Sequence, residues 1–555
     1  MVRTISVSTQ NPQGKVMKMN DLTNFSLLYP TPESAAAHYA GSDAPDISLY
    51  ELEQLGLTEI LDLRSSDINE YLTGDSETMK YRREMFSDML ECPSLSKTLN
   101  SLIPVLSDIG ELRRLESDSG NTEDYLMCMT EIELYISSID VLSRGLLPIR
   151  DKLKSEAFKT LADKIAELSE SDYYKELNKK LSELTARVRE IRSVTIGVNL
   201  DAQLRATEAG VLSINPEPFR SGDVLEKILR LNFKDDGYTC IANIVPFGKK
   251  QSDTQKTALS LAFNSAINDV YRASLRSWKR IVQSYVLENT DFLLNLMPEI
   301  EFVSRATAMM AELKEKGCPL CTPEIAPIHS RLFVADGLYN PCVALKIEDE
   351  IVPNDVEFDG NYSIFVLTGP NRGGKSVITC AVGLAQVMMQ LGMFVPAQKA
   401  TISPADAIYT HFPTGSDDTI DKGRLGEECA RLTAIFEKIT DRSLVLLDES
   451  LSSTGSFEAS YIAAEVLHGL ARVGCRCLFS THLHELAGAI DSVNEQVAVE
   501  GGSKIDTLVA GIEEGKRSFK IVRAKPDGKS YARDIAQKYG LTYDSIMKNL
   551  KSKGK

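Results

Sequence analysis

Hydrophobic positions in the first 350 residues recur mainly at intervals of three and four, which is typical of amphipathic helices. This spacing predicts a helical core over residues 51–150, after a segment, residues 1–50, to which the pattern assigns no element. A longer helix is expected from about residue 153, where loosely spaced apolar residues lead into a regular stripe. The stripe consists of Leu177, Leu181, Leu184, Val188 and Ile191.

A second long helix is expected to return after residue 250. Its apolar positions are Leu259, Phe263, Ile267, Val270, Trp278, Ile281 and Tyr285. Residues 194–250, between the two stripes, are richer in glycine, proline and β-branched residues, notably at 195–198 and 238–242. Residues 151–345 are therefore predicted to form two long helices with a small β-containing tip. A helix of about forty-five residues would span about 68 Å. An antiparallel coiled coil packed on its own domain would show the same periodicity.

The pattern changes in the C-terminal half to short, continuous apolar runs, which are typical of buried strands. Such runs occupy residues 364–367, 444–447 and 477–479, and a helix is expected over residues 377–393. Residues 346–530 are therefore predicted to form an α/β domain, followed by a helical tail over residues 531–555.

The first of these strands leads into a phosphate-binding loop. The residues Gly369, Pro370, Asn371, Arg372, Gly373, Gly374, Lys375 and Ser376 fit G-x-x-x-x-G-K-[ST]. Glycines let backbone N–H groups approach phosphate oxygens, and the N-terminal end of the following helix favours anions. Lys375 is expected to reach the β- and γ-phosphates, and the Ser376 hydroxyl to ligate Mg²⁺. A glycine-rich turn without ligand is the alternative.

Each of the other two strands ends in residues suited to ATP hydrolysis. Asp448 would hold Mg²⁺, and Glu449 would act as general base on the attacking water. His482 follows the third strand and would sense the γ-phosphate. The alternatives are an acidic strand end at a surface turn and a structural histidine.

Composition limits the class of protein without deciding its partner. With 43% hydrophobic and 25% charged residues, no apolar N-terminal leader and ten cysteines without a disulfide framework, we expect a cytoplasmic protein with no membrane span. The net charge of −16 argues mildly against tight DNA binding. Cys318, Cys321, His329 and Cys342 would suit a zinc site, a redox pair or free thiols. Because one C-x-x-C with irregular later ligands is a weak signal, we do not expect zinc.

Further motifs carry a resemblance to a known family. They are residues 368–371, 394–399 (Phe-Val-Pro-Ala-Gln-Lys), 417–418, Glu428, residues 480–486 (Ser-Thr-His-Leu-His-Glu-Leu) and 528–532 (Gly-Lys-Ser-Tyr-Ala). Through them, residues 352–541 resemble the ATPase domain of the MutS family, DNA mismatch-repair ATPases of the ABC superfamily. The family usually has an apolar residue where Arg372 stands. Its serine that reaches the second copy's γ-phosphate is missing near Gly423.

The resemblance implies an α/β P-loop ATPase domain that is ABC-like (MutS domain V). A mainly α-helical core, long lever helices and a β-containing clamp tip would precede it. It also implies ATP and Mg²⁺ as cofactors, a homodimer that sandwiches two nucleotides, and levers that encircle DNA. Ile351 lies where the family packs an apolar side chain on adenine. The Phe-x-Glu wedge of mismatch-reading members does not occur in this sequence, so we do not expect direct mismatch reading by this chain alone.

Two functions remain open at this stage. One is an ATP-hydrolysing clamp on double-stranded or branched DNA, in mismatch repair or recombination, which the resemblance favours. The other is a nucleotide-gated module on a non-DNA partner, such as a ribosome or a protein complex, which the acidic charge favours. The expected tip, residues 194–250, carries seven basic and seven acidic residues. A basic stripe on the expected returning helix consists of Arg272, Arg276, Lys279 and Arg280. The alternative, which such charge runs favour, is a solvated helix face.

Overall fold

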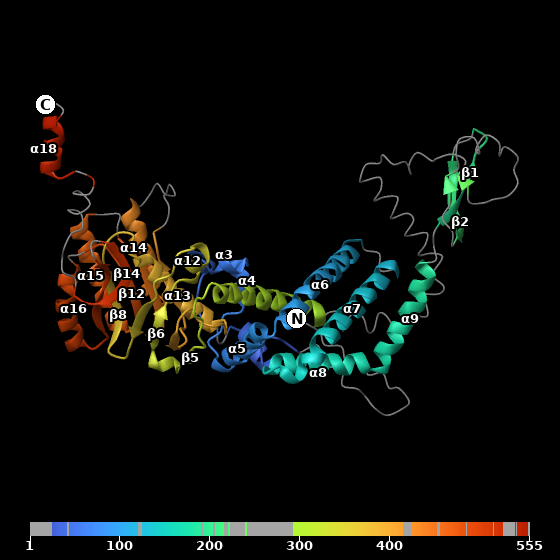
Figure 1. The fold of residues 1–555 in the computed structure, drawn as a ribbon, viewed down its shortest axis with the longest axis horizontal. Helices are drawn as coiled ribbons and strands as arrows, with labels where there is room; N and C mark the ends of the chain where they lie inside the picture. Colours follow the sequence, from blue (N-terminus) through green and yellow to red (C-terminus); the bar gives the residue numbers. More distant parts are fainter. Residues whose placement is uncertain are drawn as a thin grey trace. The chain divides into compact units, whose positions relative to one another are not determined.

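The computed structural model places the chain in two compact units, which are described separately (Figure 1). The first unit comprises Met1–Phe25, Lys97–Leu153 and Phe158–Glu301, and the second comprises Ser26–Ser96, Lys154–Ala157 and Phe302–Lys555. The structure describes residues 25–41, 44–119, 125–189, 193–203, 206–215, 220–221, 239–240, 292–413, 423–451, 455–483, 486–513, 516–525, 539 and 541–552. The returning helix and its basic stripe lie outside these residues.

The first unit is helical, with a β-hairpin after α9 (Asp172–Arg189) and the start of a further helix from residue 292. Its elements are most of α6 (Pro93–Ser119), α7 (Tyr125–Leu146), η2 (Leu147–Lys152), most of α8 (Glu156–Glu170), α9, β1 (Ser193–Leu200) and β2 (Ala206–Asn215). Leu106, Ile139 and Leu161 are fully buried, and Arg113 donates to Glu131 at 2.8 Å between α6 and α7. β1 and β2 pair antiparallel, and the short strands β3 (Arg220–Ser221) and β4 (Thr239–Cys240) pair parallel. Strands therefore lie within residues 194–250, where the sequence predicts them.

The long helix expected before this hairpin is divided. α8 ends at Glu170, and α9 begins at Asp172. At the break, Ser171 N donates to Leu168 O at 3.2 Å, and Ser171 Oγ accepts from Tyr174 N at 3.1 Å. Serine serves as an N-cap in this way because its hydroxyl replaces a missing intrahelical acceptor. The prediction of one helix from residue 153 onward is wrong, since the apolar spacing continues across a capped break.

The second unit is built on a six-stranded sheet in the order β10-β11-β12-β8-β13-β14. The strands are β10 (Ile408–His411), β11 (Leu444–Asp448), β12 (Arg476–Ser480), β8 (Tyr362–Thr368), β13 (Lys504–Glu513) and β14 (Lys516–Arg523). All neighbouring pairs are parallel except β13 and β14, which form an antiparallel pair at the edge. The three strands predicted from apolar runs are confirmed as β8, β11 and β12, and they lie side by side.

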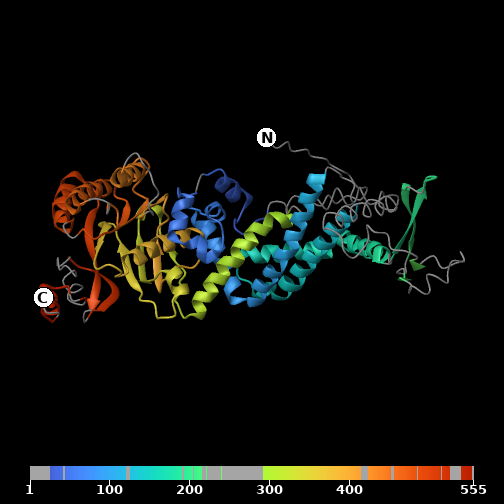
Figure 2. The same cartoon turned by 90° about the horizontal axis from the view of Figure 1, so that it is seen from above.

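Helices cover both faces of this sheet (Figures 1 and 2). One face packs on α14 (Gly423–Phe436), α15 (Ser456–Val473) and α16 (Leu486–Glu500) through buried residues such as Val366, Val445 and Phe479. α13 (Lys375–Gln390), the helix predicted after the phosphate loop, lies on the other face. A Cβ on Gly383 of α13 would stand 2.7 Å from Leu446 Cδ1 of β11, so the absence of a side chain lets helix and strand approach closely.

A smaller sheet lies beside α13 in the same unit, in the order β5-β9-β6-β7. Its strands are β5 (Glu324–Ile325), β9 (Lys399–Ile402), β6 (Phe333–Leu338) and β7 (Asn354–Phe358), with η4 (Ile328–Ser330) and α12 (Pro341–Lys346) between them. A short helix, α18 (Tyr543–Ser552), falls in the tail predicted to be helical.

The N-terminal helices of the described chain pack with this α/β unit. They are α1 (Pro32–Tyr39), α2 (Leu49–Leu55), α3 (Leu57–Leu61), α4 (Ser65–Glu70) and α5 (Ser76–Glu91). Ile408 N of β10 donates to Asp46 O at 3.0 Å, and Thr410 N donates to Glu51 Oε1 at 3.1 Å. Residues 51–96 belong to the second compact unit, and residues 97–150 belong to the first.

Candidate nucleotide site

The phosphate loop connects β8 to α13 and depends on glycine at two positions. Gly369 has a φ of 143°, and a Cβ there would stand 2.7 Å from Ala510 Cβ of β13. Gly374 has a φ of 93° and immediately precedes the first residue of α13, Lys375. Both conformations disfavour residues with a side chain. The loop therefore takes a shape that leaves Asn371, Arg372 and Ser376 exposed.

Lys375 is buried, and its ammonium group lies against the loop itself. Nζ donates to Gly369 O at 3.1 Å and to Pro370 O at 3.2 Å. Burial lowers the pKa of Lys375, and the nearby carboxylates of Glu449 and Asp448 oppose that shift. A buried ammonium group held by uncharged acceptors is well placed to exchange them for anionic phosphate oxygens, which satisfy its charge better.

Asp448 is placed next to this loop by the strand order. In the sheet register Asp448 lies beside Ser480, and Ser480 lies beside Leu367, two residues before Gly369. Ser480 Oγ donates to Asp448 Oδ1 at 2.5 Å, and Asp448 is 7% exposed. The hydroxyl fixes one carboxylate oxygen and leaves the other for a cation. Because the carboxyl ends of parallel strands meet at one edge, residues distant in sequence converge here.

Glu449, His482 and Lys375 form a continuous polar chain. His482 Nε2 lies 2.6 Å from Glu449 Oε1, and His482 Nδ1 lies 3.5 Å from Lys375 Nζ. Since the ammonium group only donates, Nδ1 accepts from it, and Nε2 carries the proton shared with Glu449. Glu449 itself has a φ of 48°, and its N–H donates to Ser480 O at 2.8 Å. Each of these residues was a separate candidate in the sequence, and the fold brings their side chains into contact.

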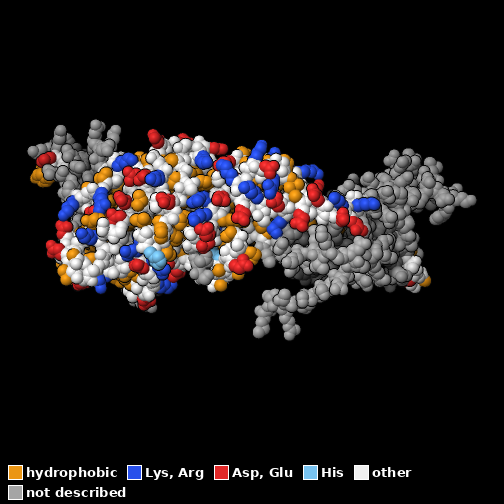
Figure 3. All heavy atoms as spheres, turned by 90° about the horizontal axis from the view of Figure 1, so that it is seen from below, with side chains coloured by type: hydrophobic (Ala, Val, Ile, Leu, Met, Phe, Trp, Pro, Cys, Tyr) orange, Lys and Arg blue, Asp and Glu red, His pale blue; other side chains and the backbone are white. Residues whose placement is uncertain are grey.

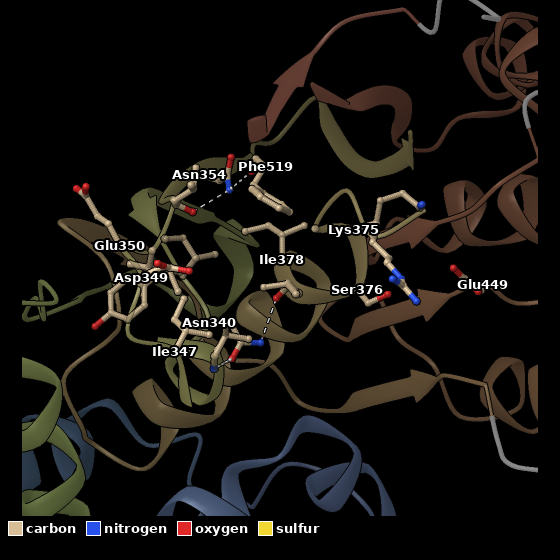
Figure 4. A pocket seen from close by; sticks show the side chains of 18 residues that line it. Asn340, Ile347, Asp349, Glu350, Asn354, Lys375, Ser376, Ile378, Glu449 and Phe519 are labelled. Carbon is tan, nitrogen blue, oxygen red and sulfur yellow. Dashed lines mark hydrogen bonds between the residues drawn. The ribbon is translucent and has the colours of Figure 1, made fainter. Parts of the chain in front are cut away.

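A cavity of about 460 Å³ opens beside the loop, within the range of small-molecule sites. Figure 4 shows Lys375, Ser376 and Glu449 at one end, Asp349 and Glu350 at the other, and Ile378 and Phe519 between them. Ile351, the residue expected against adenine, is one of the lining residues. The others are Leu338, Tyr339, Asn340, Val343, Ile347, Val352, Asn354, Arg372, Gly374 and Val377.

Phe519 is a lining residue that sequence analysis missed. Its φ is 57°, an uncommon conformation for a bulky residue, and its ring lies against Gly374, where a Cβ would be 3.7 Å from Phe519 Cδ1. The buried Asn354 side chain holds this segment, because Nδ2 donates to Phe519 O at 3.1 Å and Oδ1 accepts from Ile521 N at 2.7 Å. Strained residues held from several sides often occur at ligand sites.

The cysteine motif is not assembled into a metal site among the residues that the structure describes. Cys342 lies against the end of α2, with Sγ 3.5 Å from Gly56 O, whereas Cys321 bridges to Val395 of the α13–β9 connection. Burial raises the pKa of both thiols to about 11, which disfavours the thiolate that zinc requires.

Several motif residues from the sequence lie outside the described residues. They are residues 417–418, 484–485 and 528–532. Gly423 begins α14, and Glu428 lies within the same helix. Within the described part of the chain, no helix is both long enough and apolar enough to span a membrane.

The fold and the site define an α/β nucleotide-binding domain of the P-loop class. Its loop follows the central strand β8, and the acidic residues end β11, two strands away across β12. Comparison with known proteins identifies the family. Residues 365–549 match the family model of MutS domain V, and residues 74–316 match that of the MutS2 N-terminal domain. The chain belongs to the MutS family.

Similar curated proteins carry the name DNA mismatch repair protein MutS. That of Prochlorococcus marinus (strain MIT 9312) is 34% identical over 220 residues, which are 38% of this chain and 24% of that protein. That of Clostridium kluyveri (strain NBRC 12016) is 31% identical over 230 residues, 40% of this chain and 25% of that protein. That of Roseiflexus sp. (strain RS-1) is 39% identical over 163 residues, 28% of this chain and 15% of that protein. The chain thus spans about a quarter or less of the length of these relatives.

Proposed function

We propose that this chain is a Mg²⁺-dependent ATPase that works as a homodimeric, ATP-gated clamp on DNA. The observation that carries the proposal is that Lys375 and Glu449 line one cavity. His482 contacts both of them, and Asp448 is held by Ser480 at the same carboxyl edge of the sheet. Membership of the MutS family supports it. The predicted domain ranges, with lever helices and a clamp tip near residues 194–250, belong to the same proposal, as does a cytoplasmic location.

The chain's own residues fit a nucleotide triphosphate with magnesium. Backbone N–H groups of Gly369, Asn371, Arg372 and Gly374 would surround the phosphates, and Lys375 would pair with the terminal ones. The exposed Ser376 hydroxyl and the free oxygen of Asp448 would hold Mg²⁺, which supplies charge neutralisation during phosphoryl transfer. Ile351 and Phe519 would take opposite sides of the adenine ring.

Glu449 and His482 supply the proton chemistry in this proposal. In the structure His482 donates a hydrogen bond to one carboxylate oxygen of Glu449 and also contacts Lys375. When Lys375 turns to the phosphates, His482 would turn with it toward the γ-phosphate. Glu449 would then be released to accept a proton from the attacking water. The two residues therefore couple phosphate binding to activation of the base.

A second copy of the chain would complete the site. The side chains of His482 and Glu449 remain 35% and 36% exposed, and Arg372 and Ser376 are also exposed. Catalytic electrostatics is far stronger when water is excluded. A homodimer that covers this edge would exclude water from both of its sites.

The DNA partner is the part of the proposal for which a second candidate remains. Net charge is −16, and on the face in Figure 3 acidic and basic side chains are interspersed over the described residues. This favours the second candidate, a nucleotide-gated module on a ribosome or a protein complex. Family membership favours DNA, because the curated relatives are named for DNA mismatch repair.

We expect double-stranded or branched DNA to stimulate ATP turnover several-fold. DNA affinity should fall at least about tenfold between 50 and 200 mM salt, because neutralised phosphates release counterions. Steady-state ATPase assays with a panel of DNA shapes, paired with gel shifts at each salt concentration, measure both. Equal rates with every DNA, together with no gel shift at low salt, would reject DNA in favour of the second candidate.

Replacing Phe519 by alanine should weaken ATP binding about tenfold, since stacking on a base contributes about 1–3 kcal/mol. Affinity for inorganic tripolyphosphate should not change, because the ring would touch only the base. Calorimetry with both ligands measures the difference. Phe457→Ala is the matched control, since this aromatic is 81% exposed on α15 and does not line the cavity. Equal loss for both ligands would contradict base stacking.

A further inference from the structure

The loop that carries Glu449 is strained and needs support from outside. Glu449 and Leu451, on either side of Ser450, have φ values of 48° and 65°, although neither is glycine. Such conformations cost of order 1–3 kcal/mol each and persist only where the surroundings determine them. The side chain of Leu451 is fully buried, and Glu449 N–H is held by Ser480 O. The remaining support lies at Ser450.

His411, the last residue of β10, provides that support. His411 Nδ1 lies 2.7 Å from Ser450 Oγ, and His411 Nε2 lies 3.3 Å from Glu428 O of α14. A carbonyl oxygen only accepts, so Nε2 carries the hydrogen that faces Glu428 O. Nδ1 then accepts from the Ser450 hydroxyl, which also lies 3.1 Å from His411 O as a second acceptor. His411 is 2% exposed, and burial lowers its pKa to about 4, with the Arg431 charge acting in the same direction. One neutral tautomer therefore satisfies both contacts at physiological pH.

We propose that His411 is a positioning residue for hydrolysis: it holds Ser450, and through Ser450 the backbone of Glu449, so that the Glu449 carboxylate faces the cavity. The imidazole also ties this loop to α14. This inference rests on the proposed ATPase function and on Glu449 as its base. His411 is not one of the residues that line the cavity, so we expect it to affect the position of Glu449 and not the affinity for nucleotide.

The test compares His411→Phe and Ser450→Ala with the full-length wild-type chain. Each should lower kcat about ten- to a hundredfold, because a small misplacement of a catalytic group has effects of this size. KM for ATP should stay within about twofold. His411→Asn, which keeps an acceptor near the position of Nδ1, should recover part of the lost kcat. Ser450→Ala removes a single oxygen and remains informative if His411→Phe does not fold.

A second comparison separates positioning from general stability. In a Glu449→Gln background, His411→Phe should lower the residual single-turnover rate by less than about twofold, because the group it positions is already absent. A merely structural role would lower both rates equally. His468→Phe on α15, beside Glu500, is the matched control and should leave kcat unchanged.

The outcomes distinguish a failure of the positioning role of His411 from a failure of the proposed ATPase function. If the wild type hydrolyses ATP but both variants keep its kcat, or if their KM rises as much as kcat falls, this inference is overturned alone. An equal loss in the Glu449→Gln background also overturns it. A wild type that does not hydrolyse ATP overturns the proposed function and this inference with it.

Discussion

Replacing Glu449 by glutamine is expected to leave ATP binding within about threefold of wild type while lowering kcat by about 10²–10⁴-fold, the usual contribution of a general base. Glutamine keeps the shape of the side chain and still accepts a hydrogen bond from His482 Nε2 through its carbonyl oxygen. It cannot accept the proton of the attacking water. Calorimetry with ATP and magnesium, followed by steady-state phosphate release, measures binding and turnover on the same preparation.

The matched control for this variant is Glu465→Gln, an exposed carboxylate on α15 in the same unit. It removes the same charge without touching the cavity lining, and it should keep both affinity and kcat. Normal turnover in Glu449→Gln would reject Glu449 as the base. The water would then have to be activated by another group.

The second large effect is expected from Lys375→Met, which should weaken ATP–magnesium binding on the order of a hundredfold. Methionine keeps most of the apolar stem and removes the ammonium group. Loss of one partner of a buried charge pair costs about 2–5 kcal/mol, which corresponds to this factor or more. The wild-type ammonium group has only the carbonyls of Gly369 and Pro370 and the His482 ring as neighbours within hydrogen-bonding distance in the described contacts.

Unligated Lys375→Met should keep the melting temperature of the wild type or exceed it, since a buried cation is replaced by an apolar group. On addition of ATP and magnesium, the wild type should then gain more stability than Lys375→Met, through linkage between binding and folding. Lys399→Met, at the exposed start of β9, is the control and should behave as wild type. Undiminished ATP affinity in Lys375→Met would show that the loop does not bind phosphates as proposed.

Much of the site could be predicted from the residues because its parts are local. The phosphate loop requires glycines and a lysine at set spacings, and each catalytic candidate follows directly after an apolar run. The structure confirms the strands before Gly369, Asp448 and His482, and it confirms the helix that starts at Lys375. These requirements concern residues close together in the chain, so they produce a pattern that can be recognised in the sequence.

No comparable sequence pattern predicts the roles of Phe519, Asn354 and His411. Phe519 lies on an edge strand, where one more aromatic residue among strand residues carries no signal. Its position in the cavity follows from the pairing of β14 with β13 and from the Asn354 side chain, which comes from a different sheet. His411 is a single histidine at a strand end. Its role emerges only because α14 and the Glu449 loop fold against it.

The order of amino acids alone predicted the class of site and its ligand chemistry, because a phosphate loop and its strand-end carboxylates each occupy a few consecutive residues. Two features depended on long-range packing: the division of the helical region, where residues 26–96 join the α/β unit, and the cavity wall drawn from both sheets. Helical periodicity predicts that one face of a helix is buried, but it does not predict which element covers that face. Burial is not directional, so only the folded chain determines which buried faces meet.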